Sequence, residues 1–125
     1  MKIAANIAGG LLGLVFIAFS LMVLLKLVPI PPPPAGTPMA SFMDAFLPTG
    51  YLTFVKMFEL IGGILVAIPK TRNFGLLVLG PIILNILAFH LLIMQSVADP
   101  VLILICVLAL FLLWVGRRAF AGLMN

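Results

Sequence analysis

The stretch from Tyr51 to Pro69 most constrains the fold, because it is long and apolar enough for a membrane helix yet carries two charged residues. Lys56 and Glu59 are three residues apart, and residues at this spacing lie on the same side of a helix. Each charge at the bilayer centre costs about 2.5–3.5 kcal/mol, whereas each Leu, Ile, Val or Phe returns only about 0.3–0.6 kcal/mol. The stretch therefore predicts a membrane helix that is stable only inside a bundle where the two charges pair.

The composition supports the same class of protein. Of 125 residues, 65% are hydrophobic and 8% are charged, which excludes an ordinary soluble domain. This length accommodates about four membrane-spanning helices with short loops. The net charge of +4 comes from seven dispersed Lys and Arg residues, so no basic patch indicates a nucleic-acid partner. We predict an all-α integral membrane protein whose main partner is the lipid bilayer.

Four apolar segments define the expected four-transmembrane-helix bundle. It forms a single membrane domain over residues 1–125, with predicted spans at residues 3–28, 51–69, 74–95 and 100–116. The first segment is too long for the apolar part of a signal peptide and lacks a small-residue cleavage pattern, so we expect it to stay as the first span. Pro81 should kink the third span or remove one of its backbone hydrogen bonds. Asp99 and Pro100 predict the start of the fourth.

Residues 29–50 are expected to lie outside the membrane, between the first and second spans. Their proline run, Pro31–Pro34, favours a stiff polyproline II spacer. Thr37 followed by Pro38 predicts the start of a helix. Apolar residues then recur at helical spacing, namely Met39, Phe42, Met43, Phe46 and Leu47. Because about ten residues cannot cross a bilayer, we predict a short amphipathic helix on the membrane surface.

The distribution of basic residues predicts the orientation of the bundle. With four spans, one side of the membrane carries five basic residues, namely Lys2, Lys70, Arg72, Arg117 and Arg118. The other side carries Asp44 and Asp99, with Lys26 at its margin. Cytoplasmic loops are enriched in Lys and Arg. Both termini are therefore expected in the cytoplasm, and the surface helix is expected to face outward.

Four polar residues within the spans are the candidate ligand-binding residues: Lys56, Glu59, Asn85 and His90. At 1.5 Å per residue, Glu59 and Asn85 lie at about the same depth, so Glu59 could accept hydrogen bonds from both Lys56 and Asn85. Ionisable groups inside a membrane suggest a functional pocket. The alternative is a structural ion pair that fixes which helices meet. His90 is five residues beyond Asn85, which places the two side chains about 140° apart around an α-helix, so they need not share a face.

Small residues mark the expected contacts between helices. Gly9 and Gly13 form a G-x-x-x-G pattern in the first span, and Gly62 and Gly63 lie one turn beyond Glu59. These glycines are predicted helix-packing positions. Cys106 has no partner for an internal disulfide, and no motif for a metal site, a catalytic nucleophile or a phosphate loop is present.

Three features together resemble the DoxX family of small bacterial four-helix membrane proteins. They are Lys56-x-x-Glu59-x-x-Gly62-Gly63, the stretch GPIILNILAFHLL from Gly80 to Leu92, and the proline-rich exit from the first span. The resemblance implies a multi-pass protein of the bacterial cytoplasmic (inner) membrane. DoxD-like relatives are membrane subunits of a thiosulfate:quinone oxidoreductase, so quinone is the cofactor that the resemblance suggests. Related MauE-like proteins act in thiol redox maturation, a role that the missing cysteine pair argues against.

Three functions follow as hypotheses. The first is a membrane subunit or accessory of a quinone-linked redox system, which would receive electrons from a partner subunit because the sequence shows no redox centre of its own. The second is a non-enzymatic scaffold, assembly factor or lipid-binding protein. The third is a small-solute or proton-coupled transporter, which would need a homo-oligomer and lacks the interrupted half-helices typical of transporters.

Overall fold

A computed structural model describes residues 2–27, 33–93 and 99–124. These residues form helices and no strand, which confirms the prediction of an all-helical chain. The α-helices are α1 (Lys2–Leu24), α2 (Pro38–Phe46), α3 (Tyr51–Ala67), α4 (Arg72–Ala88), α5 (Pro100–Val115) and α6 (Arg117–Ala121). Shorter elements are the 3₁₀ turns η1 (Pro69–Thr71) and η3 (Gly122–Met124) and the π-helix η2 (Phe89–Ile93).

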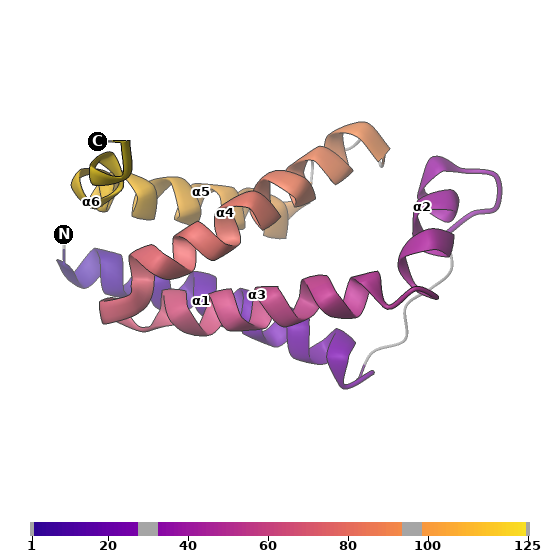
Figure 1. Ribbon diagram of the computed structural model, residues 1–125, viewed down its shortest axis with the longest axis horizontal. Helices are drawn as coiled ribbons and strands as arrows, with labels where there is room; N and C mark the ends of the chain where they lie inside the picture. Colours follow the sequence, from indigo (N-terminus) through magenta and orange to yellow (C-terminus); the bar gives the residue numbers. More distant parts are fainter. Residues whose placement is uncertain (1, 28–32, 94–98, 125) are drawn as a thin grey trace.

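The four long helices run in alternating directions, so that both termini lie at one end of the molecule (Figure 1). Helix α3 packs against α1 and α4, and α5 completes the bundle by packing against the same two helices. Helix α4 crosses obliquely and diverges from α3 toward the end where α2 lies (Figure 1). The bundle is therefore closed near the termini and splayed at the opposite end.

Two helical stretches are each long and apolar enough to cross a membrane: Lys2–Leu24 and Pro69–Ile93, both with a mean hydropathy of 2.5. A third crossing is possible if α2 and α3 count as one span, although the two helices meet at 81°. Helix α5 is apolar but has only 16 residues. By length and composition, the described chain thus has two or three candidate membrane spans.

Several predicted boundaries differ from the structure. Helix α1 ends at Leu24 rather than at residue 28, because Lys26 adopts a left-handed backbone conformation (φ 54°) that ends the helix. The predicted loop after the second span is mostly helical, since η1 leads directly into α4 at Arg72. Residues 28 and 94–95 of the predicted spans, and Pro29–Pro32 of the spacer, lie outside the described residues. Helix α4 continues through Pro81, and the change of helical geometry comes later, at η2.

Glycine contacts allow the helices to approach closely near the termini. A Cβ atom on Gly13 would lie 2.5 Å from the carbonyl oxygen of Gly63, so α1 and α3 meet backbone to backbone. Gly62 faces the other neighbour, because its Cβ would lie 2.6 Å from Leu79 of α4. Gly62 and Gly63 were predicted as helix-packing positions. In the structure each admits a different helix.

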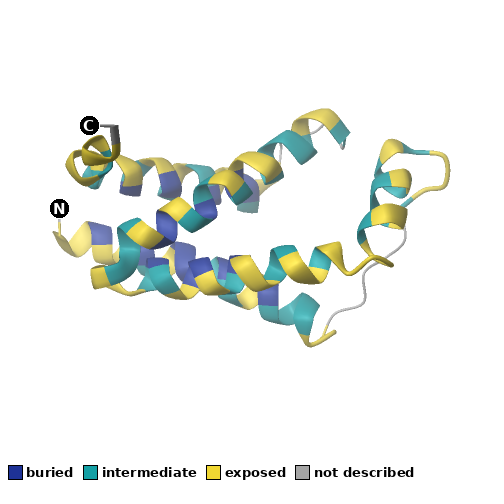
Figure 2. Ribbon diagram, viewed as in Figure 1, coloured by how far each residue is buried: buried dark blue, intermediate teal, exposed yellow. Residues whose placement is uncertain are grey.

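Apolar side chains fill the core and also cover the outside of the bundle. Most buried residues gather in the closed half, where α1, α3, α4 and α5 cross (Figure 2). Large apolar side chains are exposed on every long helix, including Leu14, Ile61, Leu84 and Leu110. Such extensive exposed apolar surface is typical of a protein surrounded by lipid.

Candidate functional site

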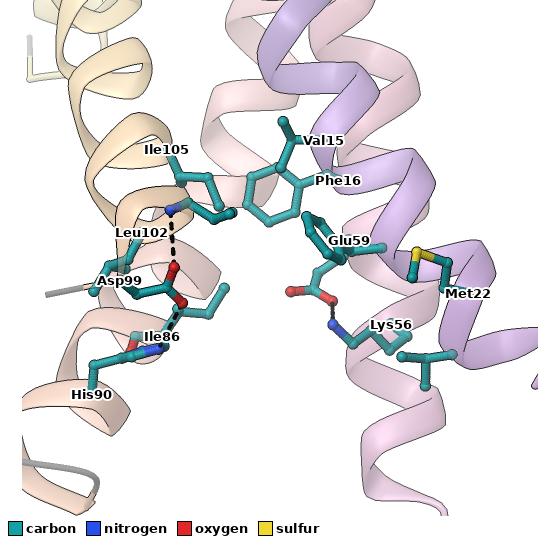
Figure 3. Close-up of a pocket in the computed structure, with 13 residues that line it drawn as sticks. Val15, Phe16, Met22, Lys56, Glu59, Ile86, His90, Asp99, Leu102 and Ile105 are labelled. Atoms are coloured by element: carbon teal, nitrogen blue, oxygen red, sulfur yellow. Dashed lines mark hydrogen bonds and ion pairs between the residues drawn. The ribbon is translucent and has the colours of Figure 1, made fainter. Parts of the chain in front are cut away.

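A cavity of about 480 Å³ lies between the four long helices, toward their splayed end (Figure 3). Helix α1 contributes Val15, Phe16, Phe19, Met22 and Val23, and α5 contributes Val101, Leu102 and Ile105. These walls are apolar. The polar atoms come from one pair of residues on α3 and another pair between η2 and the start of α5. The cavity thus combines a mainly apolar interior with two localised polar sites.

The first polar pair lies on α3. Nζ of Lys56 is 2.9 Å from Oε2 of Glu59, so the ion pair expected from their spacing is present. The side chain of Glu59 is only 4% exposed, and that of Lys56 is 20% exposed. The ammonium approaches Oε2 outside the angular range of a hydrogen bond, and this buried oxygen has no other partner among residues 2–27, 33–93 and 99–124. The second carboxylate oxygen points away from Lys56 into the cavity (Figure 3).

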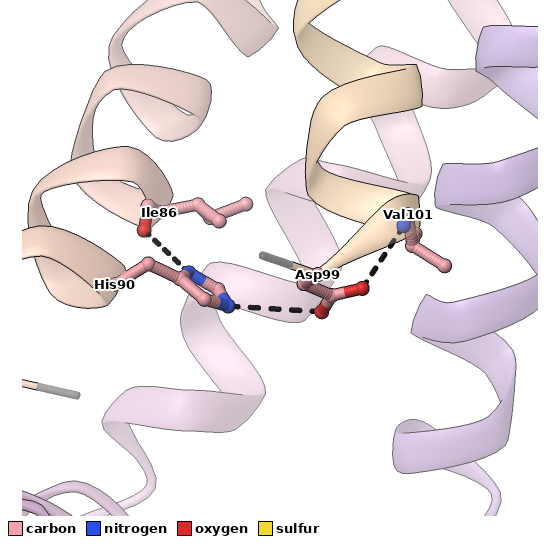
Figure 4. A network of polar contacts seen from close by, with 4 residues as sticks. All are labelled: Ile86, His90, Asp99 and Val101. Atoms are coloured by element: carbon pink, nitrogen blue, oxygen red, sulfur yellow. Dashed lines mark hydrogen bonds and ion pairs between the residues drawn. The ribbon is translucent and has the colours of Figure 1, made fainter. Parts of the chain in front are cut away.

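The second polar pair joins His90 of η2 to Asp99, the residue that caps α5. Nδ1 of His90 lies 2.8 Å from the carbonyl oxygen of Ile86. Nε2 of His90 faces Oδ2 of Asp99 at 3.8 Å, while Oδ1 of Asp99 accepts a hydrogen bond of 2.9 Å from the backbone N–H of Val101 (Figure 4). Both His90 and Asp99 are therefore held in place by the backbone, with one polar atom of each left for the cavity.

His90 lies in the π-helical turn η2, and its ring points toward Asp99 (Figure 4). The backbone hydrogen bonds of a π-helix run from residue i to i+5, so the turn is wider than an α-turn and some carbonyl groups lose their usual donor. The imidazole of His90 adds a second donor to the carbonyl of Ile86, which also accepts from the backbone N–H of Phe89. A π-helical turn is often found at functional sites. Hydrophobic periodicity gives no signal for it, so the sequence did not predict it.

A smaller cavity of about 280 Å³ adjoins the first and shares Lys56, Glu59, Ile86 and His90 with it. The apolar side of α2 forms one wall of this smaller cavity through Met39, Phe42, Met43 and Phe46. The ring of Phe42 also packs against Phe89 of η2, with the centroids 4.9 Å apart. Helix α2 therefore covers the smaller cavity at the splayed end.

The structure brings three of the four candidate residues together in the large cavity: Lys56, Glu59 and His90. The fourth, Asn85, lines the smaller cavity and is otherwise exposed. Among the described residues, no hydrogen bond joins Glu59 to Asn85, although the sequence indicated that one could form. Asn85 and His90 both line this smaller cavity. Their expected separation around an α-helix left open whether they would lie on one face.

Two further residues of this region were not among the predicted ligand-binding residues. Asp99 was predicted only as the cap of the fourth span, which it is, but its carboxylate also lines the cavity. Ser20 of α1 was not among the predicted site residues. It is fully buried, and its hydroxyl has no hydrogen-bond partner within the part of the chain that the structure describes. The antiparallel register that pairs Gly13 with Gly63 places Ser20 level with Lys56.

The opposite end of the bundle is basic. The guanidinium of Arg72 donates a hydrogen bond of 2.6 Å to the side-chain oxygen of Asn6, and its Nε lies beside Gly9, where a Cβ would be 2.8 Å away. Arg117 stacks over Trp114, 4.4 Å from the ring centroid. This end includes the chain termini (Figure 1), whereas Asp44 and Asp99 lie toward the other end.

The chain is similar to the uncharacterized protein YwoB of Bacillus subtilis (strain 168), with 36% identity over 73 residues. This alignment covers 58% of the chain but 47% of YwoB, so it spans about half the length of that relative. No protein-family model matches the chain. No solved structure matches it.

Proposed function

We propose that this chain is a four-span protein of a bacterial cytoplasmic membrane that binds a quinone-type molecule and serves a quinone-linked redox system as a membrane subunit or accessory. The observation that carries the proposal is the cavity of about 480 Å³, with its apolar walls and its two polar pairs. Small-molecule sites are typically clefts of about 300–1,000 Å³, lined by apolar side chains with a few polar groups. A quinone has a flat apolar ring with a polar group at each end, which suits such a site.

The four-span part of this proposal depends on the two shorter helices, α3 with 17 residues and α5 with 16. At 1.5 Å per residue they rise about 24–26 Å, whereas the hydrocarbon core is about 30 Å thick. A bilayer can thin around a short helix at a cost of fractions of a kcal/mol per Å. Both helices also carry large exposed apolar side chains, such as Ile61 and Leu110, which suit a lipid environment.

The orientation follows from charge. Lys2, Lys70 and Arg72 belong to segments at the end of the bundle that includes both termini, as do Arg117 and Arg118 of α6 (Figure 1). Under the positive-inside rule, this end faces the cytoplasm. The cavity would then open toward the outer half of the membrane, beneath α2.

The resemblance of residues 56–63 and 80–92 to the DoxX family supports the redox part of the proposal. DoxD-like members are subunits of a quinone-reducing enzyme, and a bound quinone would need electrons from a partner. A partner redox subunit is therefore part of the proposal.

Native mass spectrometry of protein extracted gently from its own membrane tests the proposal. We expect a quinone mass bound to the wild-type protein and to the control variant Asp44→Asn, which removes an exposed carboxylate outside both cavities. We expect that mass to be lost in Glu59→Gln and in Ile86→Trp, since the larger side chain would fill the space where the two cavities meet.

Circular dichroism and size-exclusion chromatography would establish that both variants are folded. If folded wild-type protein carries only phospholipid and fails to bind added quinone on titration, the proposal is wrong. A protein subunit that co-purifies in place of a quinone would favour the scaffold hypothesis.

A further inference from the structure

The two polar sites of the cavity share one chemical pattern. Each places a nitrogen beside a carboxylate: Lys56 beside Glu59 on α3, and His90 beside Asp99 across the cavity. Figure 3 shows the two carboxylates on opposite sides of the same space. Any ligand that spans the cavity therefore meets a carboxylate oxygen at both of its ends.

The hydrogen bonds of His90 limit what its free nitrogen can do. A carbonyl oxygen only accepts hydrogen bonds, so Nδ1, at 2.8 Å from the oxygen of Ile86, carries a proton. In a neutral ring, Nε2 is then an acceptor. Its distance of 3.8 Å from Oδ2 of Asp99 is too long for a hydrogen bond, so each of these two atoms has capacity for a ligand.

A hydroxyl group satisfies this site in either charge state of the imidazole. If Nε2 is unprotonated, the hydroxyl donates to Nε2 or to Oδ2 of Asp99. If Nε2 is protonated, it donates to the hydroxyl oxygen, and the hydroxyl donates to Asp99. A carbonyl oxygen, which only accepts, has a partner in the protonated case alone and still faces the carboxylate of Asp99.

The same reasoning holds at the α3 site. The free oxygen of Glu59 points into the cavity and can accept a hydrogen bond, while the ammonium of Lys56 can donate one. A hydroxyl can make both bonds at once. A carbonyl can use only Lys56, and it would leave the free oxygen of Glu59 facing an acceptor without a donor, a costly arrangement in an apolar site.

We propose that the cavity recognises the reduced, dihydroxy form of a quinone-type ligand in preference to the dicarbonyl form, through a hydroxyl at Lys56 and Glu59 and another at His90 and Asp99. Phe16, Leu102 and Ile105 would contact the ring between the two hydroxyls. This inference rests on the proposed function, since it specifies the oxidation state of the proposed ligand.

Binding of three matched compounds tests the inference: durohydroquinone, its dimethyl ether, and duroquinone. The ring methyl groups prevent addition of protein nucleophiles to the quinone. Affinities would be measured anaerobically on the full chain in lipid nanodiscs. We expect durohydroquinone to bind at least tenfold more tightly than the other two. A tenfold preference over duroquinone would raise the two-electron reduction potential of the bound couple by about 30 mV, because each factor of ten corresponds to about 30 mV.

The outcomes separate the inference from the proposed function. If none of the three compounds binds, the quinone-type function itself fails. If duroquinone binds as tightly as durohydroquinone or more tightly, a quinone site exists but the preference for hydroxyl groups is wrong. Equal binding of the dimethyl ether would also overturn it, because the ether has no hydroxyl to donate.

The variant Asp99→Asn tests the assignment of the second site. Asparagine is as good a helix cap as aspartate, so α5 should still begin at the same residue. The carboxylate acceptor is lost and an N–H donor is offered instead. We expect the preference for durohydroquinone over duroquinone to fall at least threefold, while Asp44→Asn, with the same change of charge on the exposed side of α2, keeps the wild-type ratio. An unchanged ratio in Asp99→Asn would contradict the proposal.

Discussion

At the scale of single residues, Glu59 is the group on which the site depends most. Its carboxylate is buried, and Lys56 is its only close charged neighbour among the described residues. Removing one member of a buried ion pair leaves the other charge without compensation, whereas replacing both with apolar side chains removes the problem. The role of the pair can therefore be separated into a stabilising part and a ligand-binding part.

We predict that Glu59→Gln lowers the free energy of unfolding by about 3 kcal/mol, because the ammonium of Lys56 then lacks its counter-ion. The double variant Lys56→Met with Glu59→Leu should recover wild-type stability to within about 1 kcal/mol, since the site becomes apolar. Thermal and denaturant unfolding in detergent micelles would measure both. A double variant as unstable as the single one would show that the ion pair itself stabilises the bundle.

The two polar pairs differ in how far the sequence could predict them. The spacing of Lys56 and Glu59 on one helix is sufficient to predict their contact. His90 belongs to η2 and Asp99 caps α5, nine positions apart in the sequence, and their approach depends on the wider π-turn and on how α4 and α5 pack. Neither factor has a local sequence signal, so only the cap role of Asp99 could be predicted.

At the scale of helices, the contact of α1 with α3 depends on the absence of side chains at a few positions. A Cβ on Gly13 would lie 2.5 Å from the oxygen of Gly63 and 2.7 Å from the Cβ of Ala67, whereas a Cβ on Gly10 would meet no described residue within 4 Å. Gly10 and Gly13 therefore form a matched pair on the same helix.

We predict that Gly13→Ala destabilises the protein by about 1–3 kcal/mol, because backbone atoms must move to admit the new methyl group. Gly10→Ala should be neutral or stabilising by up to about 1 kcal/mol, because alanine favours the helix and meets no neighbour. Unfolding of the two variants under the same conditions provides the comparison. Equal effects would indicate that α1 and α3 do not approach this closely.

Helix α2 offers a test of a cap that the sequence did predict. The side chain of Thr37 accepts a hydrogen bond of 3.2 Å from the backbone N–H of Ala40, as the Thr-Pro pattern indicates. Thr37→Ala should destabilise α2 by about 1 kcal/mol, which corresponds to about fivefold faster amide exchange in this helix. Ser41→Ala, on the exposed side of α2, is the control and should leave exchange unchanged. Hydrogen–deuterium exchange would contradict the cap role if both variants behaved alike.

The helix boundaries show why element prediction succeeded only in part. The starts of α2 and α5 have side-chain caps followed by proline, and both were predicted correctly. The end of α1 has no such signal, since apolar residues continue beyond Leu24 and only the backbone of Lys26 marks the change. Apolar periodicity likewise cannot distinguish an α-turn from the π-turn at Phe89–Ile93.

At the scale of the whole molecule, the alternating directions of the four long helices and the shared end of the two termini follow the order that the sequence predicted (Figure 1). The splay of α4 away from α3 was not predicted, although it leaves room for the cavity. Apolar residues on all sides of a helix indicate a lipid environment but not a crossing angle, because lipid and neighbouring helices are equally apolar partners.

Cysteine labelling in intact cells would test the proposed topology. In a Cys106→Ala background, we predict that Ser41→Cys reacts with an impermeant maleimide from outside, whereas Lys70→Cys and Arg118→Cys react only after the cells are opened. These positions belong to α2, η1 and α6. Labelling of Arg118→Cys from outside would mean an odd number of crossings, and labelling of Lys70→Cys from outside would mean that α3 does not cross.

The π-helix has a consequence for the evolutionary history of the cavity. Each backbone hydrogen bond of a π-helix joins residues i and i+5, one residue more than the i and i+4 of an α-helix. The deletion of a single residue from this turn would therefore restore an ordinary α-helix. Positions beyond the deletion would then rotate by about 100° around the axis, since an α-helix has 3.6 residues per turn. Homologous chains with a one-residue gap at this turn should therefore lack a histidine directed at the cap of α5. An alignment of such chains would divide those that kept the ligand site from those that kept only the bundle.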